Sequence, residues 1–124
     1  MSRTVFIQTF YRQFDEFFGQ LIQVFPSDQD FPAYKTGMSL FSKTNPLMVI
    51  NAVREHVFPF EDIIRAKNED FFLKHEFNEY TDDDAVDAVI RKIKNLWGVL
   101  TDANKAVVWS YIILLLDLAK RCVD

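Results

Sequence analysis

The sequence is poor in residues that interrupt regular secondary structure or form cross-links. Its 124 residues include one cysteine, three glycines and four prolines. The single cysteine, Cys122, excludes a disulfide bond within the chain and is typical of a protein from a reducing compartment. The scarcity of glycine and proline predicts long regular elements joined by few tight turns.

Long hydrophobic runs are also missing. The longest apolar stretch, VVWSYIILLL at residues 107–116, covers about half of the roughly 20 residues that a membrane-spanning helix needs. Near the N-terminus, polar residues interrupt the apolar run that a signal peptide requires; these are Gln8, Thr9, Arg12 and Gln13. We therefore expect a soluble intracellular protein that does not bind a membrane.

Residue types that carry catalysis are few. The chain has two histidines, His56 and His75, and its one cysteine lies near the C-terminus. No GxSxG motif surrounds Ser110, and the sequence contains no GxxxxGK[ST] or GxGxxG loop for a nucleotide phosphate. The sequence therefore predicts a protein that is not an enzyme and uses no cofactor.

Positive charge is in short supply as well. Lys and Arg number 14 against 18 Asp and Glu, which gives a net charge of −4 and a pI near 5.1. Because nucleic-acid binding depends largely on neutralising phosphates, this balance disfavours a nucleic-acid partner. A nucleic-acid or chromatin-associated regulatory factor remains the alternative function. Its mark would be a basic stripe formed by Arg91, Lys92, Lys94 and Lys105.

The sequence does contain apolar residues at helical spacing. In the first segment, before Pro26, they recur in steps of three and four: Phe6, Phe10, Phe14, Phe17, Phe18, Leu21, Ile22 and Phe25. No segment shows sustained period-two alternation or a hairpin turn signal. We therefore expect an all-α fold in which residues 1–124 form a single compact bundle of about five or six helices.

Several helix boundaries can also be predicted. Ser27 followed by Asp30 could cap a short second helix. Asn45-Pro46 is a start signal, with Asn as the N-cap and proline at the first helical position. Pro59 then ends that third helix.

The last helix is predicted over residues 103 to 121. It is apolar on most of its circumference: Val107, Val108, Trp109, Tyr111, Ile112, Ile113, Leu114, Leu115, Leu116 and Leu118. A helix of this kind lies in the centre of a core, or else presents one side to a binding partner. We expect it to be the most buried element.

The most unusual stretch is NEDFFLKHEFNEYTDDD at residues 68–84, which holds seven acidic side chains. One interpretation is a helix over residues 69–79 with its charges in water and with Leu73, Phe77 and Tyr80 facing the core. Thr81, followed by Asp84, would then cap the next helix. The other interpretations are a metal site and a docking patch for a basic partner.

The metal interpretation rests on His75, Glu79 and Asp82, which would share one face of an unbroken helix. The pattern HExxE lacks the second imidazole of HExxH, and the stretch has no glycine for a calcium loop. We therefore assign no metal ligands, and a metal-dependent enzyme is the least favoured function. The candidate acidic docking patch consists of Glu69, Asp70, Glu76, Glu79, Asp82, Asp83 and Asp84.

Aromatic side chains are the remaining candidate for a binding surface, since the chain has 13 phenylalanines. Six aromatic residues could anchor a protein interface: Tyr11, Phe14, Phe18, Trp97, Trp109 and Tyr111. At helical spacing, such residues more often form the core. Because 13 phenylalanines exceed what a small core usually uses, we expect some to be exposed.

Four segments resemble a known group of proteins: FPSDQDFPAYK, HVFPFEDII, KNEDFFL and KIKNLWGVLTDANKAVVWSYIILLLDLAK. In their order, over residues 14–120, the chain is similar to small helical proteins of nucleocytoplasmic large DNA viruses. The resemblance implies a protein of the infected cell, located in the host cytoplasm or nucleus or packaged in the virion. It brings no catalytic motif, so no functional residue is carried over. We expect a non-enzymatic interaction or virion-associated protein that binds a protein partner or itself.

Overall fold

The computed structural model describes residues 3–74 and 85–123. Within these residues every regular element is helical, which confirms the all-α fold. The α-helices are α1 (Arg3–Val24), α2 (Asp30–Thr44), α3 (Pro46–His56), α4 (Glu61–Arg65), α5 (Glu69–Lys74), α6 (Ala85–Leu96) and α7 (Asp102–Val123). Two short 3-10 helices, η1 (Phe58–Phe60) and η2 (Trp97–Val99), lead into α4 and follow α6.

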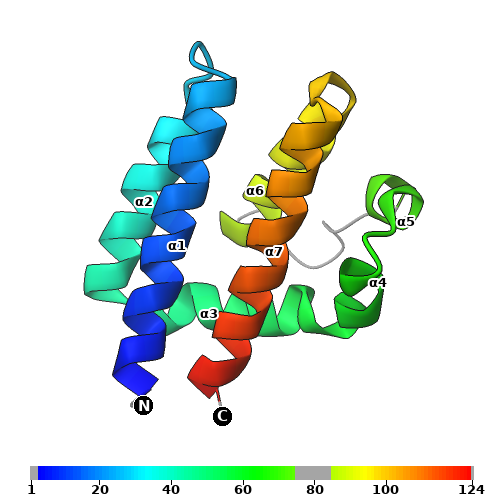
Figure 1. Cartoon of the computed structure of the whole chain (residues 1–124). Helices are drawn as coiled ribbons and strands as arrows, with labels where there is room; N and C mark the ends of the chain where they lie inside the picture. The colour runs from blue at the N-terminus through cyan, green and yellow to red at the C-terminus, as the bar shows by residue number, and fades with distance from the viewer. Residues whose placement is uncertain (1–2, 75–84, 124) are drawn as a thin grey trace.

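The two long helices, α1 and α7, pack antiparallel to each other, and the shorter helices lie around them. Figure 1 shows α1 and α7 side by side in opposite directions, with α2 on the far side of α1 and α3 running across the lower end. Both termini lie at that lower end, where Arg3 Nε donates to the Cys122 carbonyl at 2.5 Å. The ends of the chain are thereby joined by a direct contact.

The connection from α4 to α5 is a sharp turn within a short stretch of chain. Lys67 has a φ of 54°, in the left-handed region that commonly ends a helix. Asn68 then caps α5, because its Oδ1 accepts a hydrogen bond from the Phe71 backbone N–H at 3.1 Å. This turn separates two helices of five and six residues.

The start of α2 differs from its prediction. The N-cap position is Gln29, and the side chain that accepts a backbone hydrogen bond there is Asp28, from the Asp30 N–H at 2.8 Å, rather than Ser27. The helix is also longer than expected, at 15 residues. Asn45 does occupy the N-cap of α3 before a proline, as predicted, but its side chain makes no capping hydrogen bond.

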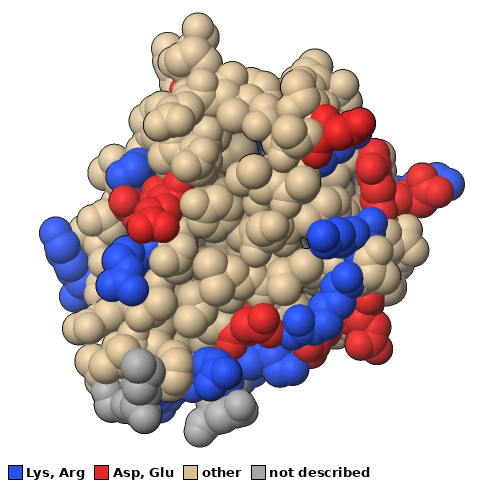
Figure 2. All heavy atoms as spheres, viewed as in Figure 1, with Lys and Arg blue, Asp and Glu red and all other residues tan. Residues whose placement is uncertain are grey.

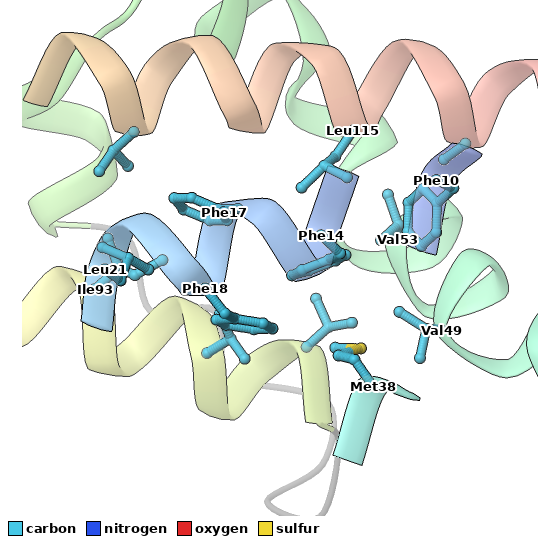
Figure 3. Close-up of a cluster of buried hydrophobic side chains, with 14 of the residues drawn as sticks. Phe10, Phe14, Phe17, Phe18, Leu21, Met38, Val49, Val53, Ile93 and Leu115 are labelled. Carbon is cyan, nitrogen blue, oxygen red and sulfur yellow. The ribbon is translucent and has the colours of Figure 1, made fainter. Parts of the chain in front are cut away.

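Phenylalanine rings of α1 form the centre of the core. Phe10, Phe14, Phe17 and Phe18 are at most 6% exposed, and their neighbouring rings lie 5.2–6.4 Å apart. In Figure 3 these rings point toward side chains from α2, α3, α6 and α7, namely Met38, Val49, Val53, Ile93 and Leu115. A run of large rings on one helix therefore fixes where the other helices pack.

The aromatic residues belong to this core rather than to an exposed surface. Five of the six candidate interface aromatics are buried, and Tyr111, the sixth, is half-buried and stacks on Phe17 at 5.0 Å. None of the phenylalanines that the structure describes is exposed, so the expectation of exposed phenylalanine was wrong for these residues. Phenylalanine fills a larger share of this core than is usual in a small protein, and this accounts for the number of phenylalanines in the chain.

Helix α7 contributes to the core along one side. Its buried residues are Val108, Trp109, Leu115, Leu116, Leu118, Ala119 and Cys122. Thr101 caps it, since its Oγ1 accepts from the Asn104 N–H at 3.1 Å. The opposite side is exposed at Val107 (40%) and Leu114 (37%). The apolar C-terminal helix is therefore a core element with one apolar side left in solvent.

Candidate functional site

The acidic stretch is only partly described, and of its two described acids one is paired and the other is exposed. Helix α5 begins at Glu69, as predicted, and Leu73 is half-buried. Glu69 pairs with Lys105 of α7 at 3.3 Å, while Asp70 is exposed in the first turn of α5. Both acids lie in the first turn of α5, where the helix dipole favours negative charge, and this accounts for their positions.

The rest of that stretch lies outside the described residues. This holds for the acidic positions Glu76, Glu79, Asp82, Asp83 and Asp84. It also holds for His75, for the Phe77 and Tyr80 rings and for the Thr81 cap. The docking-patch and metal interpretations therefore stay hypotheses at these positions. Within residues 3–74 and 85–123, no group of three His, Cys, Asp or Glu side chains could hold a metal ion.

Two of the four residues of the predicted basic stripe, Lys92 and Lys105, are paired with acids of the same chain. Lys92 pairs with Asp28 at 2.6 Å and Asp30 at 2.8 Å, and these carboxylates raise its pKa. Lys105 pairs with Glu69 and lies over the Trp97 ring, with its Nζ 5.6 Å from the ring centre. Because paired cations have less to gain from phosphates, this arrangement disfavours the nucleic-acid alternative.

The candidate nucleophiles and bases differ in how far they are buried. Cys122 is fully buried, and burial raises the pKa of its thiol, which disfavours the reactive thiolate. His56 is buried at the end of α3. Ser110 lies on the exposed side of α7. That Cys122 has no catalytic neighbour stays a prediction.

The most distinctive surface is one without charge. It lies across α1 and α7 and is formed by Gln13, Gln20, Ala103, Val107, Ser110 and Leu114, which we call the α1–α7 face. Figure 2 shows a broad tan area over these two helices, with Lys, Arg, Asp and Glu gathered around its edges. Gln20 and Val107 line one shallow hollow between the two helices, so the two sides of the face are continuous.

A second feature, which the sequence did not indicate, is an apolar cavity of about 90 Å³. Its lining comes from α1 and from most of the elements between α3 and α7, and includes Phe14, Val53, Ile93 and Leu115. The residues belong to seven separate stretches of chain. No local pattern could have grouped them, because each is an ordinary core position on its own helix.

Comparisons with known proteins add no assignment. No family model, curated protein or solved structure matches the chain. The similarity to helical proteins of large DNA viruses therefore rests on the sequence patterns alone. Among the helices of the described residues, none is both long and apolar enough to span a membrane.

Proposed function

We propose that this chain is a non-enzymatic interaction protein that binds another protein through the α1–α7 face. The observation that carries the proposal is that none of the six side chains defining this face is charged. Charged residues make up 26% of the sequence, and in Figure 2 residues of both signs lie around the edges of this face. The interior of a protein interface is depleted in charge, whereas an ordinary solvated helix face is not.

The geometry of the face suits a helical partner. Ala103 and Ser110 are small, so they let a second helix approach α7 closely, while Val107 and Leu114 supply apolar surface to bury. Burial of such surface contributes about 25 cal/mol per Å². Gln13 and Gln20 provide amide groups at the edge formed by α1, where hydrogen bonds to a partner can still be made.

The sequence patterns supply a biological context for the proposal. The resemblance to helical proteins of large DNA viruses suggests an infected-cell protein whose partner is a virion component, a host protein or a second copy of the chain. A regulatory role on nucleic acid stays the less favoured alternative, because Lys92 and Lys105 are engaged by carboxylates of the same chain.

Site-specific photo-cross-linking tests the proposal. A photoreactive amino acid replaces Ser110, and cross-linking is carried out in purified protein at several concentrations and in infected cells. We expect a discrete cross-linked protein, either the chain itself or a second polypeptide. Adding Val107→Lys and Leu114→Lys should abolish the adduct, because two ammonium groups would have to be buried in the interface.

The matched control places the same probe at Leu40, which is 58% exposed on α2 and outside the α1–α7 face. A Leu40 probe should give no adduct of the same mass. The proposal fails if the Ser110 probe gives no discrete adduct, or if the double lysine variant, folded by circular dichroism, gives the same adduct.

A further inference from the structure

The apolar cavity lies in the interior, between α1 on one side and α3, α6 and α7 on the others. Figure 3 shows Phe14 and Phe17 of α1 directed toward Leu115 of α7 and Val53 of α3. These four side chains are at most 6% exposed, and all four line the cavity. Both α1 rings are stacked on neighbouring rings, Phe14 on Phe18 and Phe17 on Tyr111.

Part of the cavity lining is half-buried and comes from η1 and α5. Phe60 and Phe71 line the cavity there, with ring centroids 5.5 Å apart, and both are half-buried. Ile64 and Ile90 are likewise half-buried lining residues. The described lining is therefore apolar where it is half-buried as well as where it is buried, and none of these residues is charged.

The chemistry of the walls selects what the cavity can hold. Asn68 is the one polar residue among the described lining residues, and its Oδ1 already accepts from the Phe71 N–H. A buried water needs two to four polar partners, and apolar cavities without them stay dry. An empty space also leaves its lining atoms without dispersion contacts, so occupation by apolar atoms recovers them.

We propose that this cavity binds one small, uncharged apolar molecule. A volume of about 90 Å³ is of the same order as the cavity of about 150 Å³ that binds benzene or xenon. It is too small for a partner helix, and no charged residue lines its described walls to hold an anionic head group. The site is separate from the α1–α7 face, so this proposal does not depend on the proposed function.

Benzene and xenon are the probes for the test, with the full chain labelled with ¹³C at its methyl groups. Titration should give saturable shifts at the methyls of Val53, Ile93 and Leu115, which line the cavity. The exposed methyls of Leu40 and Val99 should not move. Because a ligand of the native state raises its stability, benzene near saturation should raise Tm by about 2–8 °C.

Two variants change the size of the site in opposite directions. Val57→Phe puts a larger ring at a half-buried lining position and should remove the benzene-dependent rise in Tm. Leu115→Ala enlarges the cavity and should increase that rise. Leu40→Phe, which adds a ring on the exposed side of α2, should leave it unchanged.

Three outcomes would overturn the proposal. One is that neither probe shifts the lining methyls of the unmodified chain, whatever the variants do. Another is that Val57→Phe folds and shows the same Tm rise as the unmodified protein. The third is that benzene binds only after Phe77→Ala, which would identify a ring of the chain itself as the occupant.

Discussion

Tyr11 shows how a single side chain connects segments that are far apart in the sequence. Its hydroxyl donates to the Pro46 carbonyl at the start of α3 at 2.6 Å, and the residue is 8% exposed. Burial, with a smaller contribution from nearby Cys122 of α7, raises the pKa of Tyr11 to about 12. The surroundings of Tyr11 in the folded state therefore favour the protonated, neutral phenol.

Replacing Tyr11 with Phe removes this hydrogen bond and leaves the ring in place. We expect the free energy of unfolding at pH 7 to fall by about 0.5–1.5 kcal/mol. The raised pKa means that the folded state keeps the phenol proton longer than the unfolded state does. Tyr11 therefore stabilises fully below pH 10 and progressively less between pH 10 and about 12.

Urea denaturation of both proteins from pH 7 to 11.5 measures this effect. The difference in stability between the unmodified chain and Tyr11→Phe should shrink above pH 10. Phe10→Leu, which carries no titrating group at the neighbouring position, should show no comparable narrowing with pH. A constant difference over the whole range would contradict the assignment of the raised pKa to burial.

At the scale of the element, α7 has two faces of similar composition in different environments. Leu115 is 5% exposed and lines the cavity, whereas its neighbour Leu114 is 37% exposed on the α1–α7 face. The periodicity of apolar residues could not separate them, because nearly every position from 107 to 118 is apolar. Packing against α1 and α3 decides which side is covered.

Two neighbouring leucine-to-alanine variants test this difference. Leu115→Ala should reduce the free energy of unfolding by about 2–5 kcal/mol, because it removes buried methyl groups and enlarges the cavity that Leu115 lines. Leu114→Ala should cost about 0.5 kcal/mol in the monomer, as surface substitutions do. Equal losses in urea denaturation would show that α7 is covered on both sides.

At the scale of the whole molecule, ion pairs connect helices that are far apart in the sequence. Lys92 of α6 joins Asp28 and Asp30 at the start of α2. Glu61 of α4 accepts from Lys120 of α7 and from Arg65, which also pairs with Asp117 of α7. The hydrogen bond from Lys92 lowers the pKa of Asp28, and those from Lys120 and then Arg65 lower the pKa of Glu61.

These lowered pKa values predict that the protein loses stability over a defined range of acidic pH. A carboxyl group with a lowered folded-state pKa stabilises the protein above its unfolded value and loses that contribution as the pH falls through the folded value. The stability of the chain should therefore decline below the ordinary values of 4.5 for Glu61 and 3.8 for Asp28.

The double variant Asp28→Asn with Glu61→Gln tests this expectation in thermal melts between pH 7 and 2.5. Its Tm should depend less steeply on pH below 4.5 than that of the unmodified chain. Asp70→Asn is a control, since this exposed acid lies in the first turn of α5. If Tm falls equally steeply with pH in the double variant and in the unmodified chain, these ion pairs are not the source of the acid sensitivity.

The sequence by itself determined the helical fold, the apolar C-terminal helix and several helix ends. Steps of three and four between phenylalanines define the buried side of α1, and Asn45-Pro46 marks the start of α3. Such features are local, because they depend on residues within about one or two helical turns. The same local reasoning placed the cap of α2 at Ser27, whereas Asp28 accepts the hydrogen bond there, since backbone geometry at the turn decides which oxygen can reach the N–H.

Only the tertiary structure decided which surfaces are free. Lys92 and Lys105 look like part of a basic stripe in the sequence, but acids from α2 and α5 neutralise them across distances of 36 residues or more along the chain. The α1–α7 face and the cavity likewise depend on how α1, α3, α6 and α7 come together. Long-range packing selects one arrangement among many that share the same helices, and no local pattern encodes that choice.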